Sequence, residues 1–360
     1  MARPDTQTQF AIDALMKRIH HGDHGATRLP GERQLAAELG LSRQTVRRAI
    51  RHLTDQGTIA RDATGRLRIA SPDTHDGDAR GGTTTTRQRI IVCLRPPSSS
   101  FEVERWRTDI EKAVASRGAV TRSIIYEHAS DTAISTALKG GYDGVFFHPR
   151  SRMQPWLMKQ LREAPARVVV VDHDASPQGL RSVAVFPDAA ERKLLEHLVT
   201  LGHRRIDCFN VHGHNSVIEA RIGQWRRFLD QHGLDGELYS TETAGIEAAR
   251  DELTALLRSG RRPGTALLCT TLYAAMGGMR ALHEAGLRIG RDISLCVIND
   301  EGLGPFLIPS LTCLQSPSRV PYLRKAVDWM LGRADWPLPS LEQPKTAPLF
   351  IGESTGPAPA

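Results

Sequence analysis

The sequence predicts an α/β protein in two parts: a small helical head at the N-terminus and a larger two-lobed body with two parallel sheets and helices on both faces. Three observations support this fold class. The first 70 residues carry amphipathic helical patterns, a polar stretch without large apolar side chains follows, and the rest of the chain alternates apolar strand-like runs with amphipathic segments. Such alternation is typical of parallel sheets covered by helices.

Length and composition set the outer limits of the architecture. The chain has 360 residues, which at ~100–200 residues per domain gives two or three domains. Hydrophobic residues make up 40%, enough for several cores. No apolar run approaches the ~18 residues of a membrane helix, and residues 1–10 lack the apolar core of a secretory signal. We therefore expect a cytoplasmic protein without a membrane partner.

The cysteines support the same compartment. Their number is odd, they are widely spaced, and they contain no C-x-x-C pair; they are Cys93, Cys208, Cys269, Cys296 and Cys313. This pattern favours reduced, buried thiols over a disulfide framework or a zinc site. The pairs His21/His24 and His212/His214 have no carboxylate or thiol at ligand spacing, so we expect no metal and no cofactor.

Positive charge is concentrated near the N-terminus. Residues 1–89 contain 15 Lys and Arg against 10 Asp and Glu, whereas the remainder contains 32 against 30. A basic head on a nearly neutral body suggests that the head meets a polyanion. Residues 71–89 are rich in Gly, Asp and Thr and predict a flexible linker. The expected domains are therefore a head at 1–70, a linker at 71–89 and a body at 90–355.

Three helices are expected in the head. Apolar residues recur at helical spacing over 12–19, a second helix starts after Pro30 and stops at Gly40, and a third opens at Ser42 as its N-cap. Four side chains share one outer arc of the third helix: Gln44, Arg47, Arg48 and Arg51. Segments 58–61 and 66–70 predict a basic hairpin beside it. The head therefore reads as a helix–turn–helix with a hairpin wing.

The chemistry of this outer face suits DNA. Arginine pairs in a bidentate manner with guanine, and Gln44 can do the same with adenine. Arg43 lies in the first turn of the third helix, where a helix end that enters a groove makes its contacts. The hydroxyls of Ser42 and Thr45 can hold a phosphate oxygen. In the wing, Arg66 can reach the neighbouring groove.

The segment LPGERQLAAELGLSRQTVRRAIRHLTDQGTI resembles the winged helix–turn–helix of the GntR family. The resemblance covers about 65 residues. It implies that five side chains contact DNA: Arg33, Ser42, Arg43, Thr45 and Arg47. The sequence departs from the family at Gly31, where a serine is usual, and in the wing, where Arg66 would replace the usual contact.

The body predicts seven strands with helices between them. The strands are expected at 89–94, 124–126, 144–148, 168–172, 206–211, 265–269 and 293–298, and the helices near 101–117, 133–139, 154–163, 188–200, 216–232 and 272–285. Two sets of such units favour two lobes with a cleft between them. Ligands of such sheets bind beyond the C-terminal ends of the strands.

The motifs LGHRRI, GRDISLCVIND, IPSLTCLQSP and GESTG, in this order, resemble the LacI/GalR effector-binding domain, which is related to periplasmic sugar-binding proteins. The resemblance implies that the chain dimerises and passes between lobes near Phe186, Thr312 and Trp336. Lobe 1 would comprise about 90–186 and 313–335, and lobe 2 about 187–312 and 336–355.

The expected effector site draws on both lobes. Arg221 stands at the position of the family's ligand-binding arginine, and Ser100, His148 and Asp172 lie in or beside loops after lobe 1 strands. Three positions depart from the family's polar anchors: Thr271, Asn299 and Ser316. A cleft that keeps the arginine and loses carboxylates suggests an anionic ligand such as a phosphorylated sugar.

Together these features predict a DNA-binding transcriptional repressor that acts on a palindromic operator and responds to a sugar or sugar derivative. One alternative is a regulator whose altered cleft binds nothing. Another is a sugar- or nucleoside-binding protein or enzyme fused to a basic head. The sequence has no G-x-S-x-G and no H-E-x-x-H motif, so we do not expect an enzyme.

Overall fold

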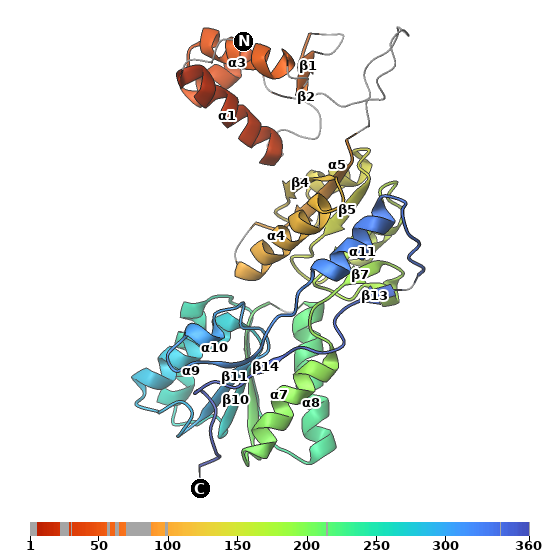
Figure 1. Cartoon of the computed structure of the whole chain (residues 1–360). Helices are drawn as coiled ribbons and strands as arrows, with labels where there is room; N and C mark the ends of the chain where they lie inside the picture. The colour runs from red at the N-terminus through yellow and green to blue at the C-terminus, as the bar shows by residue number, and fades with distance from the viewer. Residues whose placement is uncertain are drawn as a thin grey trace.

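The computed structural model describes most of the head and body of the chain (Figure 1). The described residues are 6–21, 29, 31–55, 58–61, 65–69, 88–97, 100–213, 215–338 and 340–359. The expected linker lies outside them up to residue 87, and so do His24 and His214. Within the described part, every helix is too short or too polar to cross a bilayer.

The head contains three helices and a hairpin. The helices are α1 (Thr6–His21), α2 (Glu32–Leu39) and α3 (Arg43–Asp55), and the strands are β1 (Ile59–Arg61) and β2 (Leu67–Ile69). The strands pair antiparallel, so the predicted wing is present. One apolar core joins all five elements; it includes Leu15, Leu35, Val46, Ile50, Leu53, Ile59 and Leu67. Gly40 ends α2 in the left-handed region at φ 63°, which glycine adopts without strain.

Lobe 1 is built on a six-stranded sheet in the order β13-β7-β6-β5-β3-β4, all parallel. Its strands are β3 (Ile90–Arg95), β4 (Val120–Ile125), β5 (Gly144–Phe147), β6 (Val168–Val171), β7 (Arg181–Val183) and β13 (Ser340–Glu342). Its helices are α4 (Phe101–Ala115), α5 (Thr132–Lys139), α6 (Pro155–Arg162) and α11 (Val320–Met330), with the short turn η1 (Ser176–Gln178). Helices α4 and α11 bury one face of the sheet, and α5 and α6 bury the other.

Lobe 2 repeats this layering with the strand order β14-β12-β11-β10-β8-β9. Its strands are β8 (Ile206–Val211), β9 (Leu238–Thr241), β10 (Ala266–Cys269), β11 (Ser294–Val297), β12 (Thr312–Leu314) and β14 (Leu349–Phe350); β14 pairs antiparallel and the others pair in parallel. Its helices are α7 (Asp188–Thr200), α8 (Ser216–His232), α9 (Ile246–Arg258) and α10 (Leu272–Glu284), with the turn η2 (Gly304–Phe306). The predicted α/β class with two parallel sheets is confirmed.

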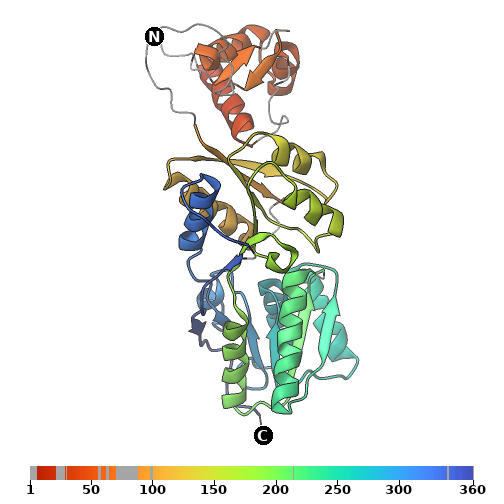
Figure 2. The ribbon, with the colours of Figure 1, turned by 90° about the vertical axis from the view of Figure 1, so that its right-hand side faces the viewer.

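The chain passes between the lobes three times (Figure 2). The first passage joins β7 to α7 at Phe186, and the second follows β12, both close to the expected positions. The third was expected near Trp336, but it lies after Glu342. Trp336 is 2% exposed and lies in the core of lobe 1, and β13, the next strand in the sequence, pairs with β7. This segment therefore still belongs to lobe 1.

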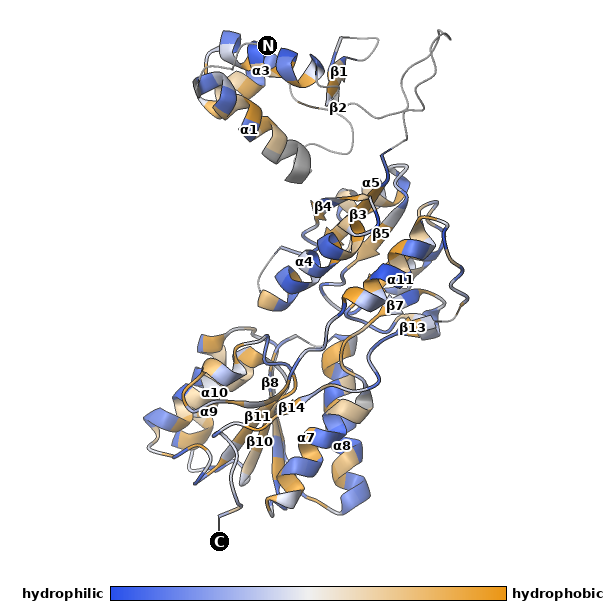
Figure 3. Cartoon of the chain, in the orientation of Figure 1, coloured by the Kyte–Doolittle hydropathy of each residue, from blue (hydrophilic) through white to orange (hydrophobic). Residues whose placement is uncertain are grey.

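Apolar side chains fill both faces of each sheet, which gives the body four buried clusters. Figure 3 colours much of the sheet strands as hydrophobic. All five cysteines are buried and free, as expected for reduced thiols. Burial raises the pKa of the Cys93 thiol to about 12, so this sulfur stays protonated and unreactive.

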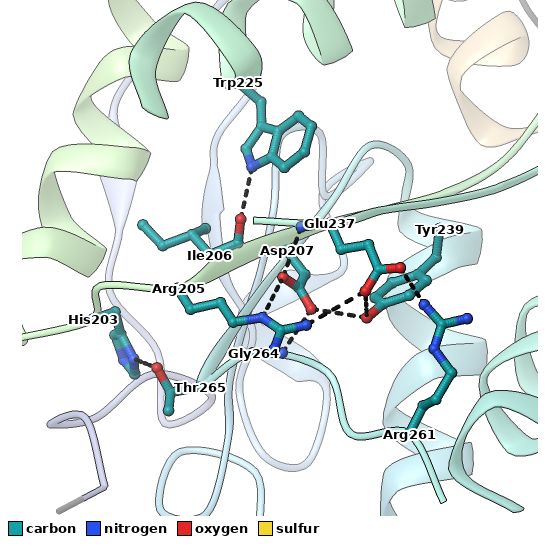
Figure 4. A network of polar contacts seen from close by, with 10 residues as sticks. All are labelled: His203, Arg205, Ile206, Asp207, Trp225, Glu237, Tyr239, Arg261, Gly264 and Thr265. Atoms are coloured by element: carbon teal, nitrogen blue, oxygen red, sulfur yellow. Dashed lines mark hydrogen bonds and ion pairs between the residues drawn. The ribbon is translucent and has the colours of Figure 1, made fainter. Parts of the chain in front are cut away.

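A polar network closes the end of lobe 2 opposite the C-terminal ends of its strands (Figure 4). The fully buried Asp207 accepts hydrogen bonds from the backbone N–H of Gly264 at 2.6 Å and of Glu237 at 2.9 Å, and from the Tyr239 hydroxyl at 3.1 Å. Arg205 Nε approaches the same carboxylate at 3.3 Å. The network therefore ties three loops to one buried charge.

His203 secures the last segment of the chain to the same sheet. Its Nδ1 lies 2.9 Å from the Thr265 hydroxyl, and its Nε2 lies 2.9 Å from the Ser294 hydroxyl and 3.1 Å from the Gly356 carbonyl. Ser354 joins in by donating to the Leu295 carbonyl at 2.6 Å. The motifs LGHRRI and GESTG are far apart in the sequence but adjacent in space. Their hydrogen bonds join the C-terminal segment to the sheet of lobe 2.

Candidate DNA-binding surface and interlobe cleft

Helix α3 separates its buried and exposed side chains sharply. Val46, Ala49, Ile50 and Leu53 are at most 2% exposed and pack on α1 and α2. The opposite face is exposed and strongly basic; it carries Arg43, Gln44, Arg47, Arg48 and Arg51. Arg33 on α2 and Arg66 beside the wing are exposed as well. Seven of the eight expected DNA contacts, all but Thr45, therefore lie on the surface of the head.

Ser42 and Thr45 form the start of α3. The Ser42 Oγ accepts a hydrogen bond from the Thr45 backbone N–H at 3.1 Å and lies 2.8 Å from the Thr45 hydroxyl. Ser42 is therefore the N-cap that the sequence predicts. Thr45 is only 8% exposed, so its hydroxyl serves this cap in the unbound protein.

Glu32 holds two of the basic side chains. Its carboxylate accepts from Arg47 Nε at 2.9 Å and from Arg61 Nη2 at 2.7 Å, which links α2, α3 and the wing. Burial acts to raise the pKa of Glu32, but the two guanidinium hydrogen bonds outweigh it and lower that pKa. Arg47 is thus held in place before any ligand arrives, whereas Arg43 is exposed and forms no such ion pair with the residues that the structure describes.

A cavity of about 890 Å³ lies between the two lobes. Six of the seven expected effector residues line it: Ser100, His148, Asp172, Arg221, Thr271 and Asn299. The seventh, Ser316, lies beside the cleft, where its hydroxyl accepts a hydrogen bond from Arg319 Nη2 at 2.9 Å. The structure therefore brings together residues separated by up to 199 positions in the chain.

Three of the lining side chains cap helices that begin at the cavity. Ser100 accepts from the Val103 backbone N–H in α4, Asn215 from Ile218 in α8, and Thr271 from Ala274 in α10. The first-turn amides nearest the cavity are therefore partly satisfied by the protein itself. This arrangement weakens the attraction of these helix ends for an anion.

Arg221 extends from α8 to the floor of the cavity. It is 8% exposed, its Nη1 donates to the Thr270 carbonyl at 2.6 Å, and its guanidinium lies 6.0 Å from the centre of the Phe186 ring. Phe186 stands where the chain first passes between the lobes, so Arg221 contacts both the ligand cavity and the hinge region.

On the lobe 1 side, His148 and Asp172 face each other. His148 Nε2 lies 3.7 Å from Asp172 Oδ2, and Asp172 adopts a left-handed backbone at φ 68°. Burial acts to raise the pKa of Asp172, but the hydrogen bond and charge of His148, with contributions from His173 and Arg221, lower it. Burial lowers the pKa of His173 to about 4, so this ring is neutral at pH 7.

The sequence reasoning missed several acidic residues of the cavity. Five carboxylates line it, from Glu102, Asp172, Glu247, Asp251 and Glu301, against two arginines, Arg150 and Arg221. Both arginines already donate to backbone carbonyls. Glu301 lies a few residues after the end of β11, and this position in the sequence could have identified it as a cavity residue. The balance of charge disfavours the phosphorylated ligand that we inferred from the altered anchors.

Glu301 has an unusual environment at the cleft. Burial and the neighbouring Glu102 carboxylate raise its pKa to about 7, against the opposing effect of Arg105, Arg221 and the Glu102 backbone N–H. Its backbone is also left-handed, at φ 50°, which is strained for a residue with a side chain.

Replacing Glu301 by glutamine is expected to stabilise the protein at pH 8 by up to about 3 kcal/mol and to change little at pH 4.5. Between pH 4.5 and about 7 the folded state keeps a proton on Glu301 that the unfolded chain releases, so wild-type stability falls as pH rises through this window. Thermal unfolding between pH 4.5 and 8 measures the effect. Glu163→Gln, at the exposed end of α6, is the control; parallel pH curves for wild type and Glu301→Gln would contradict the prediction.

Two family models match the chain. The model for bacterial regulatory proteins of the gntR family matches residues 7–69, and the model for a periplasmic binding protein-like domain matches residues 195–355. The HTH-type transcriptional regulator AglR of Rhizobium meliloti (strain 1021) is 34% identical over 189 residues, which cover 49% of this chain and 50% of that protein. The lactose operon repressor of Escherichia coli (strain K12) is 29% identical over 143 residues, 39% of each chain.

Solved structures support the fold of the body. A structure of the lac repressor dimer bound to operator and the anti-inducer ONPF aligns with a TM-score of 0.65 at 21% identity, over 76% of this chain and 96% of that one. The chain spans about half the length or less of the curated relatives it matches. The matched relatives are HTH-type transcriptional regulators and repressors.

Proposed function

We propose that this chain, which joins a DNA-binding domain of the gntR family to a periplasmic binding protein-like domain, is a transcriptional repressor whose operator binding responds to a small molecule in the interlobe cleft. The operator DNA that it binds would lie in the cytoplasm, so the protein would act there. The observation that carries the proposal is the combination of an exposed basic face on α3 with a cavity of about 890 Å³ between two lobes.

The head would read DNA through α3. In a helix–turn–helix the second helix lies in the major groove, with its N-terminal residues at the base edges. Arg43 and Gln44 are the exposed residues at that end, and both have the hydrogen-bonding groups for bidentate contacts with a purine. Arg33, Arg48 and Arg66 surround them and would hold the phosphates, while Ser42 and Thr45 fix the start of the helix.

The cleft would bind a neutral, hydroxyl-rich ligand such as a sugar. Its size suits a small molecule, and its lining combines carboxylates, two arginines and histidines with the apolar side chains of Phe101 and Ile246. Such a lining favours a bound ligand over the alternative of an empty, unresponsive cleft. Ligand binding would close the lobes and shift the heads between forms that bind operator and forms that do not.

Selection of genomic fragments by the purified protein, followed by sequencing, tests the proposal. We expect enrichment of a palindromic site, and release of that site by a neutral sugar rather than by its phosphorylated form. Retention of all fragments alike, collapsing as salt rises, would mean phosphate binding alone and would remove the regulator claim.

A palindromic operator requires two heads, and the body offers a surface for a second copy. Phe306 and Ile308 are 81% and 95% exposed, which is unusual for large apolar side chains. Ile308 lines a groove of about 580 Å³ together with Met276, Met279 and Leu287, and Phe306 lies two residues before it in the chain. We assign this face of lobe 2 to a homodimer contact, consistent with the dimeric lac repressor structure that the body resembles.

Replacing Ile308 by aspartate is expected to convert the dimer to a monomer and to weaken operator binding at least tenfold. A charge at the centre of an apolar contact loses its hydration on association, whereas it remains hydrated in the free monomer. Analytical ultracentrifugation measures the assembly. Leu338→Asp, on lobe 1 at 50% exposure, is the matched control. An Ile308→Asp protein that sediments as wild type would place the dimer contact elsewhere.

A further inference from the structure

Two charged side chains from opposite lobes meet at the cleft without pairing. Arg105 belongs to α4 of lobe 1, and Glu301 to the loop after β11 of lobe 2. Arg105 Nη1 and Glu301 Oε2 are both buried, and neither atom has a hydrogen-bond partner among the residues that the structure describes. A β-carbon placed on Gly302 would lie 3.5 Å from Arg105 Nη1, so the guanidinium lies next to the loop that carries Glu301.

Such an arrangement is costly where it stands. A buried charged atom without a partner loses its hydration and gains nothing in return. A small movement of one lobe toward the other would bring these two groups together. Each would then gain a partner that compensates for its lost hydration. The open cavity beside them leaves room for that movement.

The remaining groups around Glu301 do not offer the same partnership. Glu102 pairs with the buried Arg319 at 2.6 Å, and Arg221 donates to the Thr270 carbonyl. Tyr273 also faces Glu301, but burial raises the pKa of its hydroxyl, so it stays neutral. Arg105 is therefore the cation placed to neutralise Glu301.

We propose that Arg105 and Glu301 form an ion pair when the cleft closes, and that this pair holds the closed form. The inference rests on the proposed function, in which closure of the cleft transmits the ligand signal. A second interlobe pair, Arg152 and Glu219 at 3.8 Å, lies at the rim with side chains 73% and 42% exposed. Exposed pairs contribute little, so the buried pair decides how readily the lobes close.

We call the ion pair between Arg105 and Glu301 the latch. Distances between spin labels on the two lobes test it without ligand or DNA. Lys139→Cys on α5 and Asp230→Cys on α8 supply exposed attachment sites, and the five native thiols are buried. We expect two distance populations at pH 8, with the shorter one reduced at least threefold in Glu301→Gln and in Arg105→Gln. The double variant should lose no more than either single one. At pH 6, where Glu301 is mostly protonated, wild type should resemble the variants.

Two further variants sharpen the result. Arg107→Gln removes the same charge from the same helix, but its partners Glu104 and Glu111 are in α4, so the shorter population should persist. Exchanging the charges, with Arg105→Glu and Glu301→Arg together, should restore it. A single population in wild type, or equal losses in Arg107→Gln, would overturn the latch. Because no DNA is present, that outcome would leave the repressor proposal standing.

Discussion

Replacing Arg43 by alanine is expected to weaken binding to the selected operator by about 1–3 kcal/mol, roughly 5- to 150-fold, while leaving the fold intact. Arg43 is exposed in the first turn of α3, the part of a recognition helix that enters the groove. If Arg43 makes the proposed bidentate contact to guanine, its loss removes two hydrogen bonds to the base. Fluorescence anisotropy with the operator and with a scrambled duplex measures the change.

The scrambled duplex separates the two roles open to Arg43. A base contact predicts a large loss on the operator and a small one on scrambled DNA, whereas a phosphate contact predicts equal losses and a shallower salt dependence. Lys159→Ala, which removes one exposed positive charge from α6, is the control for net charge. Equal affinity of wild type and Arg43→Ala for the operator would exclude α3 from base recognition in the way proposed.

Replacing Asp207 by alanine is expected to destabilise lobe 2 by about 3–5 kcal/mol, the cost of breaking a buried charge network by removing one partner. The change leaves the backbone N–H groups of Gly264 and Glu237 and the Tyr239 hydroxyl without their shared acceptor. Hydrogen exchange of β8 and β10 in the intact protein reports on this lobe separately. Lobe 1 and the head should exchange as in wild type.

Asp230→Ala provides the matched control, because Asp230 is exposed on α8 of the same lobe. Exposed substitutions of this kind change stability by about 0.5 kcal/mol or less. If β8 and β10 of the Asp207→Ala protein keep wild-type protection, the network in Figure 4 is dispensable and the lobe depends on its apolar clusters alone.

The sequence predicted the head and the central strands well because their signals are local. In the head, apolar spacing marks the helices, a serine N-cap begins α3 and a glycine ends α2, and the four valines of β6 are buried. Seven elements outside the expected strand and helix pairs were not predicted: the helices α9 and α11, whose apolar residues do recur at helical spacing, and the strands β7, β9, β12, β13 and β14. Most of these strands have two or three residues, so alternation had too few positions to show.

The effector residues at strand ends could be predicted for a similar reason, since parallel strands bring their ends to one edge. Glu102 and Arg105 could not, because their importance arises only where a helix of lobe 1 meets a loop of lobe 2. The predicted position of the third passage between the lobes was wrong for the same reason. Trp336 packs on Trp329, with ring centres 6.0 Å apart, and this tertiary contact keeps the segment in lobe 1.

The interleaved connectivity of the body has a consequence for its biosynthesis. Lobe 1 needs α11 and β13, and lobe 2 needs β12, β14 and the segment held by His203, so neither can be completed until residues 312–359 have left the ribosome. The head needs only its own core and can fold as soon as it emerges. A ribosome that stalls or stops early in residues 312–359 would release a chain whose head is folded and whose two lobes are incomplete. Such a fragment would lack the folded lobe 2 face that we assign to the dimer contact, so it would present a single head and bind a palindromic operator weakly.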